Sequence, residues 1–335
     1  MDYELHIDRT IEELLKALSK KQVFDMSRTM AYFGLDASSG FAFNVPKGCL
    51  AADADVVGMI AVTRERMRHW SRWGSLPGVE RLLFRNPIAM RTRKAPQSGI
   101  VVAARTQLAQ RMKTPQKDSE TPDLLTRFLE AMKRNPDTLD ETAVVSLLIS
   151  MIAAGSDTSS NAIAATMFFL MKNPEKLAKL RTELETVDLS RPIPVYSQVS
   201  KSPYLHAVIK EGIRLFPPLT HVIERLVPAG GAEIVGTYLP PGTSVGCLQL
   251  AMHLNPKVFG KDAETFRPER WLEASAEQLR IMEVAHIGFG RGRRVCIGQH
   301  IAMMEIKKVI STLLLGFEVS SLWRRSYKHL EIVES

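Results

Sequence analysis

The chain is poor in cysteine, and the few cysteines it has show no regular spacing. Cys49, Cys247 and Cys296 are the three cysteines among its 335 residues. An odd number of cysteines without a repeated spacing excludes a disulfide framework and the paired-cysteine pattern of a structural zinc site. We therefore expect a protein of a reducing compartment, in which Cys49 and Cys247 are ordinary thiols.

Other sequence signals are missing as well. Residues 1–21 are charged and amphipathic, which is typical of neither a secretory signal nor a membrane anchor. No internal repeat or low-complexity stretch stands out. The net charge is +8, but aromatic residues make up only 7% of the chain and are not interleaved with the basic ones. This pattern argues against a nucleic-acid-binding protein.

What the chain does contain is apolar residues at helical spacing. Hydrophobic residues make up 45% of it and charged residues 24%, which is ample for a globular core. We expect one domain over residues 1–335 with a mainly α (α+β) fold, in which 222–245 forms short strands broken by glycine and proline. The periodicity predicts helices over 10–18, 24–40, 53–70, 101–113, 121–132, about 140–170, 175–185, about 202–216 and 297–315.

The most informative segment runs from Phe289 to Gly298. It fits the spacing F-x-x-G-x-R-x-C-x-G, with Gly292, Arg294 and Cys296 at the remaining fixed positions. The glycines allow a tightly held loop, and the start of the following helix favours an anionic sulfur. The alternative is a buried structural cysteine at a helix start, but five matches in ten residues favour a thiolate ligand.

This spacing resembles the haem-binding loop of the cytochrome P450 family. The resemblance implies that Cys296 is the axial ligand of the iron of haem b, and that Arg294 pairs with a haem propionate. It places Arg225 where a second propionate-binding arginine occurs, although an exposed strand arginine is an equal alternative. The remaining loop positions that it assigns to cofactor binding are Phe289, Gly292 and Gly298.

The predicted helix over about 140–170 carries a polar cluster in an otherwise apolar stretch. Such a cluster is too costly for a membrane span and favours a buried core helix. The segment Ala154–Thr158 matches the A-G-x-[DE]-T pattern of the same family. We expect Asp157 and Thr158 to relay protons to bound oxygen, with the Thr158 hydroxyl locally opening the helix. The alternative is a cluster of Ser and Thr side chains that satisfy one another.

An E-x-x-R pair lies on the predicted helix over about 202–216. Glu211 and Arg214 are three residues apart and can meet on one helix face. The segment Phe266–Trp271 resembles the F-x-P-x-R element of the family, in which the arginine completes a buried network. By this resemblance Glu211, Arg214 and Arg270 form that network here. Its role is structural, because it pins the loop that presents Cys296.

The resemblance implies a monooxygenase that inserts one oxygen atom of O2 into a small apolar substrate. A thiolate ligand on haem iron favours cleavage of the O–O bond. Electrons would come from NADPH through a flavoprotein reductase that docks on a basic face near Arg291, Arg293, Lys307 and Lys308. Residues 23–27 resemble fungal members related to pisatin demethylase, which indicates secondary metabolism.

The chain also departs from the family pattern. The front section of full-length members has no counterpart here, and residues 321–326 do not resemble their final hairpin. Full-length relatives are anchored at the endoplasmic reticulum, so we expect this chain in the cytoplasm or peripherally at that membrane. The alternative function is a truncated, inactive paralogue that no longer binds haem.

Overall fold

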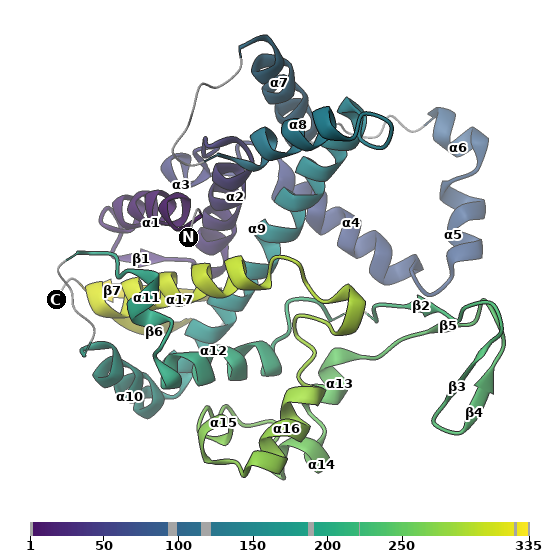
Figure 1. Cartoon of the computed structure of the whole chain (residues 1–335). Helices are drawn as coiled ribbons and strands as arrows, with labels where there is room; N and C mark the ends of the chain where they lie inside the picture. The colour runs from purple at the N-terminus through teal and green to yellow at the C-terminus, as the bar shows by residue number, and fades with distance from the viewer. Residues whose placement is uncertain are drawn as a thin grey trace. The chain divides into compact units, whose positions relative to one another are not determined.

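The computed structural model describes residues 3–92, 99–114, 122–186, 191–220, 222–324 and 327–333 (Figure 1). The chain forms two compact units, Met1–Asp157 and Thr158–Ser335, and the boundary falls inside one long helix. The prediction of a single domain over the whole chain stays a prediction.

The first unit is helical apart from a two-residue strand. Its elements are α1 (Glu4–Leu18), β1 (Val23–Phe24), α2 (Met26–Phe43), α3 (Cys49–Ala52), α4 (Met59–Trp73), α5 (Pro77–Phe84), α6 (Pro87–Thr92), α7 (Gly99–Lys113), α8 (Leu124–Arg134) and the first half of α9 (Glu141–Lys172).

Helix α2 is the centre of this unit and packs against α1, α3 and α8. Helix α1 buries one apolar stripe that includes Ile7, Ile11 and Leu14, at the spacing expected of an amphipathic helix. Helix α2 is buried nearly all round, and its Asp36 accepts hydrogen bonds from the backbone N–H groups of Cys49 and Leu50. Asp36 thereby satisfies the unpaired amides at the start of α3.

The second unit combines the remaining helices with short strands. After the second half of α9 its elements are α10 (Pro174–Leu184), α11 (Tyr196–Val199), α12 (Pro203–Leu215), β2 (Arg225–Leu226), β3 (Ala232–Ile234), β4 (Thr237–Leu239), β5 (Ser244–Val245), α13 (Gln249–His253), α14 (Pro256–Phe259), α15 (Arg270–Glu273), α16 (Ala276–Ala285), a 3-10 turn at Gly292–Arg294, α17 (Gln299–Gly316), β6 (Glu318–Arg324) and β7 (Tyr327–Val333).

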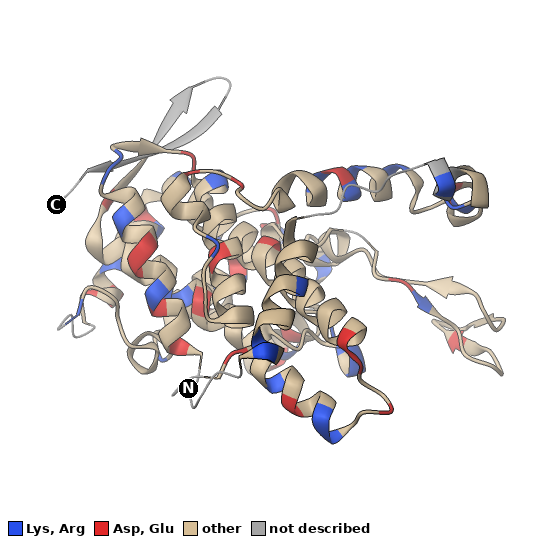
Figure 2. Ribbon diagram, turned by 90° about the horizontal axis from the view of Figure 1, so that it is seen from above, with Lys and Arg blue, Asp and Glu red and all other residues tan. Residues whose placement is uncertain are grey.

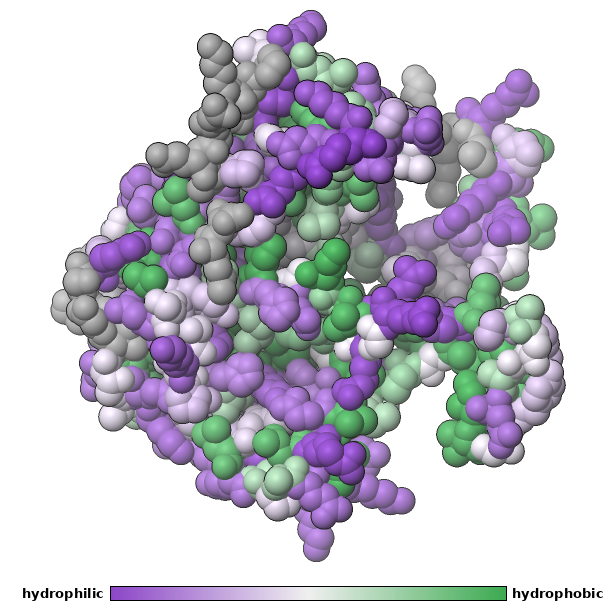
Figure 3. Space-filling model, viewed as in Figure 1, coloured by the Kyte–Doolittle hydropathy of each residue, from purple (hydrophilic) through white to green (hydrophobic). Residues whose placement is uncertain are grey.

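The strands of residues 222–245 form two antiparallel pairs, β2 with β5 and β3 with β4. The β3–β4 hairpin extends beyond the β2–β5 pair in Figure 1, and Figure 3 shows hydrophobic side chains on its surface. Its tip is Val235–Gly236, where both residues have positive φ and Val235 is 98% exposed. A β-branched residue is unusual in this left-handed conformation, for which glycine or asparagine is preferred.

Helices α12 and α17 pack against each other at the centre of the second unit. Helix α12 also lies close to the second half of α9. A Cβ atom added at Gly212 would come 2.4 Å from the hydroxyl oxygen of Thr166 on α9. That hydroxyl already donates to the carbonyl oxygen of Ala162 at 2.7 Å, so it cannot easily move away. Gly212 is therefore required by a close helix–helix approach.

Sequence periodicity predicted the helices of 11 residues or more in the described part of the chain, with ends that differ by up to six residues, and gave no ranges for the shorter ones. Helix α9 spans Glu141–Lys172 against a prediction of about 140–170, and α12 spans Pro203–Leu215 against about 202–216. Residues 321–324, whose sequence does not resemble the family's final hairpin, nevertheless lie in a strand pair, while residues 325 and 326 lie outside the described residues. Strands β6 and β7 pair antiparallel from Glu318↔Val333 to Arg324↔Tyr327.

We predict that Gly212→Ala destabilises the chain by about 1–3 kcal/mol, because the added methyl group overpacks the contact with Thr166. The matched control is Gly78→Ala in α5, where nothing lies within 4 Å of the new atom. The control should be neutral or slightly stabilising, since alanine is the better helix former. Thermal unfolding of the two variants measures the difference, and equal midpoints would contradict the close approach.

Candidate functional site

The loop from Phe289 to Gly298 is held by its own backbone. The Cys296 N–H donates to the Phe289 carbonyl oxygen at 2.8 Å, and the Val295 N–H donates to that of Gly292 at 3.1 Å. Gly290 and Gly292 have φ values of 72° and 68°, a conformation that glycine adopts without strain. Both glycines are therefore required by the backbone that carries Cys296 to the start of α17, and Gly292 is also a fixed position of the motif.

The three cysteines lie in different environments, and all are free. Cys49 is buried, and burial raises the pKa of its thiol to about 11, which keeps it protonated and unreactive. Cys247 and Cys296 are exposed. Only Cys296 adjoins the start of a long helix, α17, where backbone N–H groups favour an anion.

The surroundings of Cys296 fit a flat, apolar and anionic-edged group. Val295 and Ile297 on either side of it are 42% and 89% exposed. Arg294 is exposed in the same loop, so a guanidinium is available for a carboxylate. The exposed Cys296 sulfur can act as a ligand of haem iron. The exposed apolar side chains beside it can contact the apolar face of a haem, and Arg294 can pair with a propionate.

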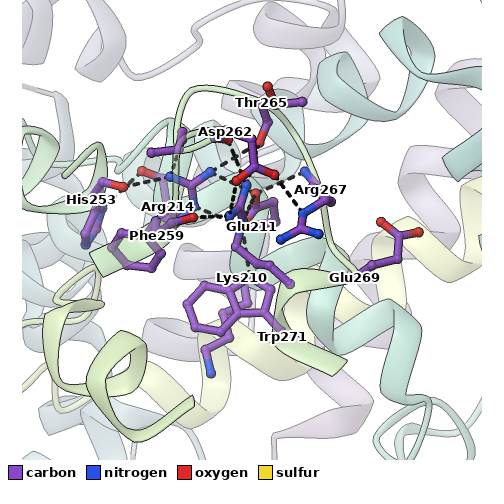
Figure 4. Close-up of polar contacts among 12 residues, drawn as sticks. Lys210, Glu211, Arg214, His253, Phe259, Asp262, Thr265, Arg267, Glu269 and Trp271 are labelled. Atoms are coloured by element: carbon purple, nitrogen blue, oxygen red, sulfur yellow. Dashed lines mark hydrogen bonds and ion pairs between the residues drawn. The ribbon is translucent and has the colours of Figure 1, made fainter. Parts of the chain in front are cut away.

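The structure brings Glu211, Arg214 and Arg270 together, and each is at most 2% exposed. Figure 4 shows Glu211 beside Arg214. The Arg214 guanidinium donates to both carboxylate oxygens of Glu211, at 2.9 and 2.8 Å, and Arg270 Nε donates to one of them at 2.8 Å. Arg214 also donates to the carbonyl oxygens of His253 and Ala263. The network thus joins α12 to the segment between α13 and α15.

Two further members of this network were not anticipated from the sequence. Trp271 Nε1 donates to Glu211 at 2.9 Å. Asp262 accepts a hydrogen bond from Arg270 at 3.3 Å and forms an ion pair with Arg267 at 2.8 Å. Partial burial opposes ionisation of Asp262, but Arg270, Arg267 and a backbone hydrogen bond together outweigh it and lower the pKa of that carboxyl. Two carboxylates therefore balance the two buried guanidinium groups, which is the condition for tolerating such charges in a protein interior.

The predicted relay residues lie on α9, where Asp157 ends the first unit and Thr158 begins the second. Asp157 is exposed and Thr158 is half-buried. The expected local opening of the helix at Thr158 is wrong, because α9 is α-helical without interruption from Glu141 to Lys172. Ser150 and Thr166 also bond to carbonyl oxygens one turn back in α9, and the helix accommodates both bonds.

The small size of Gly155 has a second explanation. A Cβ atom added there would lie 2.9 Å from the hydroxyl oxygen of Ser38 on α2. Among the described helices, α9 is long and apolar enough to cross a membrane. However, Ser156, Ser159 and Ser160 near its middle are buried in protein, as expected of a core helix.

A buried carboxyl that the sequence did not single out lies next to the relay segment. Glu305 of α17 is 4% exposed and accepts a hydrogen bond from Ser159, the residue that follows Thr158. Burial raises the pKa of Glu305 to about 7, only partly opposed by the Ser159 hydrogen bond. A carboxyl that titrates near neutrality beside the relay segment can both hold and release a proton.

Other predicted residues have less distinctive surroundings. Arg225 on β2 is exposed, and its guanidinium donates to the carbonyl oxygens of Ile223 and Glu224. The basic face predicted near the thiolate loop is smaller than expected, because Lys307 and Lys308 are 4% and 0% exposed. Lys307 Nζ donates to the Ser200 carbonyl oxygen at 2.8 Å. The expectation that these two lysines are exposed on that face is wrong.

The exposed cations near this loop are Arg291, Arg293 and Arg294. A cavity of about 480 Å³ adjoins the loop, and Lys210, Glu283, Arg291 and His300 are among the residues that line it. Lys210 is paired with Glu283. Figure 2 shows cationic and anionic residues interspersed along the helices.

Comparison with known proteins identifies the family to which these features belong. The sequence model of the cytochrome P450 family matches residues 2–328. A cytochrome P450 monooxygenase of Aspergillus terreus is 32% identical, and the alignment covers 96% of this chain and 68% of that protein. A crystal structure of a cytochrome P450 superposes with a TM-score of 0.80 over 99% of this chain and 74% of that chain, at 24% identity, and shows the shared fold.

Two other fungal relatives are longer than this chain. The cytochrome P450 monooxygenase mfmA of Annulohypoxylon moriforme is 34% identical over 90% of this chain, and the alignment covers 61% of that protein. The cytochrome P450 monooxygenase mpaDE of Penicillium roqueforti is 33% identical over 97% of this chain. The chain spans 39% of the length of mpaDE.

We predict that Glu305→Gln changes how stability depends on pH. The folded-state pKa of about 7 lies above the ordinary value of 4.5, so the stability that Glu305 contributes is fully present below pH 4.5 and is lost as the pH rises to 7. The unfolding free energy of the unsubstituted chain should therefore fall, relative to Glu305→Gln, by up to about 3 kcal/mol across this window. Urea unfolding at a series of pH values measures it, and parallel curves would contradict the assignment.

Proposed function

Because the chain belongs to the cytochrome P450 family, we propose that it is a haem-thiolate monooxygenase. It inserts one oxygen atom of O2 into a small, largely apolar organic substrate. The observation that carries this proposal is Cys296, an exposed cysteine that a backbone-bonded loop presents at the start of an 18-residue helix. The same loop fills every fixed position of the family motif.

In this proposal Cys296 is the axial ligand of the iron of haem b. Haem with a thiolate ligand supplies the chemistry of dioxygen activation. Arg294 pairs with a propionate from within the loop, and Arg225 can do so once its guanidinium leaves the backbone carbonyls that it now contacts. The shape of the loop is set by Phe289, Gly292 and Gly298. The position of the loop is fixed by the buried network of Glu211, Arg214 and Arg270.

Thr158 and Asp157 move protons in this proposal. A half-buried hydroxyl next to an exposed carboxylate can pass a proton from solvent toward a site beside α9. Glu305 with its Ser159 partner is adjacent to this path and, with a pKa of about 7, can exchange a proton with it. These residues hold and transfer protons, while the network around Glu211 takes no part in the chemistry.

Electrons come from NADPH through a flavoprotein reductase. The exposed arginines of the thiolate loop, Arg291, Arg293 and Arg294, give an acidic partner a cationic surface. The resemblance of residues 23–27 to fungal members related to pisatin demethylase supports a role in secondary metabolism. We further propose a cytoplasmic location or a peripheral one at the endoplasmic reticulum.

We predict that the chain, produced with ample haem, gives a thiolate-type carbon monoxide difference spectrum that Cys296→Ser abolishes. The substitution removes the thiolate that donates electron density to the iron. The matched control is Cys247→Ser, which changes another exposed cysteine and should keep the spectrum. A colourless folded chain would instead support the alternative, an inactive paralogue without haem, and a spectrum that survives Cys296→Ser would exclude this ligand.

A second prediction concerns the relay. Thr158→Ala should divert electrons from product to peroxide and lower the coupled fraction of NADPH oxidation by about tenfold or more, because a general acid is lost. The control, Ser150→Ala, removes an exposed hydroxyl from the same helix. Measuring peroxide and NADPH consumption in parallel tests this, and unchanged coupling in Thr158→Ala would remove Thr158 from the relay.

A further inference from the structure

A buried histidine joins the E-x-x-R helix to the start of the thiolate loop. The ring of His253, at the end of α13, has 0% exposure, and its Nδ1 lies 3.1 Å from the carbonyl oxygen of Arg214 (Figure 4). The backbone N–H of Ile287 donates to His253 Nε2 at 3.0 Å. Since an N–H can only donate, Nε2 carries no proton, and the neutral ring donates from Nδ1 to Arg214.

Backbone hydrogen bonds continue from Ile287 to the cysteine. The Ile287 carbonyl oxygen accepts from the N–H of Gly290 at 2.8 Å, and the Phe289 carbonyl oxygen accepts from the N–H of Cys296 at 2.8 Å. These backbone hydrogen bonds therefore link the position of Ile287 to that of Cys296. No side chain other than His253 is needed to connect this path to Arg214.

A second histidine supports the first. The ring of His286 stacks on that of His253, with 5.1 Å between centroids and 12° between planes, and it meets the edge of Trp271 at 5.5 Å. His286 Nε2 lies 3.2 Å from the carbonyl oxygen of Lys210 and can only donate to it. Trp271 in turn donates to Glu211, so both histidines contact the same network.

The segment that begins the loop lies in close contact with α12 at Gly288. A Cβ atom added at Gly288 would lie 2.5 Å from a methyl carbon of Ile213 and 3.3 Å from the His286 ring. Glycine at this position allows the backbone between His286 and Phe289 to lie directly on α12. The start of the loop is therefore held both by the hydrogen bond from Ile287 to His253 and by the contact of Gly288 with Ile213.

We propose that His253 and His286 are positioning residues for the thiolate loop. Their two neutral, stacked rings connect the Glu211 network to Ile287, and the position of Ile287 in turn determines the position of Cys296. The inference rests on the proposed function for its consequence, but the coupling itself is a property of the chain alone. Protonation of His253 at Nε2 would remove the acceptor of the Ile287 N–H and uncouple the loop.

The charges around the pair favour its neutral form. Burial is the main cause that lowers the pKa of His253 to about 4 and that of His286 to about 3. The cations that face the rings are Lys210 and Arg214, which oppose a further positive charge. The nearby carboxylates are already occupied, Glu283 by Lys210 and Glu211 by the two arginines. The coupling should therefore hold at neutral pH and fail as the pH falls toward 4.

Two variants of one residue separate positioning from packing. In His253→Asn the side-chain amide can still donate to the Arg214 carbonyl oxygen but offers no acceptor at the place of Nε2. In His253→Gln the amide oxygen can reach that place and accept from Ile287. Hydrogen exchange of the Ile287 amide in the haem-free chain should be about three- to tenfold faster in His253→Asn than in His253→Gln, as the loss of one hydrogen bond requires.

The pH dependence gives an independent readout in the unsubstituted chain. Protection of Ile287 should fall as the pH approaches 4 and should persist over the same range in His253→Gln, which has no titrating ring. Equal protection of Ile287 in the two variants, or the same acid loss in His253→Gln, would overturn the proposal. The pH comparison decides the matter even if His253→Asn does not fold.

The haem-loaded protein links the coupling to function. The fraction of thiolate-type carbon monoxide spectrum should fall in His253→Asn and be retained in His253→Gln. If the chain binds no haem, the proposed function fails while the exchange experiment still judges the coupling. If haem binds and the two variants give the same spectrum despite different exchange at Ile287, the claim that the loop is positioned for the ligand is refuted.

Discussion

The second unit depends on the hydrogen bonds and ion pairs that the Glu211 carboxylate makes. This carboxylate accepts hydrogen bonds from two buried guanidinium groups, from the Trp271 indole and from the backbone N–H of Arg267. Buried charges of this kind add little net stability, but leaving one unpaired is costly. The arrangement therefore specifies one conformation of the segment between α13 and α15 rather than strengthening the fold.

The site is built outward from that carboxylate. Arg214 donates to the carbonyl oxygens of His253 and Ala263, and His253 accepts from Ile287. The loop then places Cys296 just before the start of α17. On another side of α12, Gly212 admits Thr166 and so sets how closely α9 approaches in this unit. Helix α12 thus contacts both the loop that carries Cys296 and the helix that carries Thr158, the residue proposed for the relay.

Much of this was predictable from sequence because the signals are local. Helical periodicity located α9 and α12, and the spacing of motifs predicted the network of Glu211, Arg214 and Arg270. The role of Cys296 as a ligand stays a prediction. The rest depends on contacts between distant segments. The acceptor role of His253, the burial of Lys307 and the raised pKa of Glu305 depend on which helix faces which, and no spacing within α13 or α17 encodes that. The pairing of β6 with β7 was likewise not predicted, because the sequence of residues 321–326 does not resemble the final hairpin of the family.

The long sequence separations within the network have a consequence for how the chain acquires its structure. Glu211 and Arg270 are 59 residues apart, and Arg214 binds carbonyl groups 39 to 51 residues further along. Closing such loops costs entropy that only the completed cluster offsets. During synthesis α12 emerges well before its partners, so its acid and base must remain hydrated until Trp271 has left the ribosome. A chain that stops before Trp271 lacks the partners that Glu211 and Arg214 need, so these two charges cannot be buried until that segment is made.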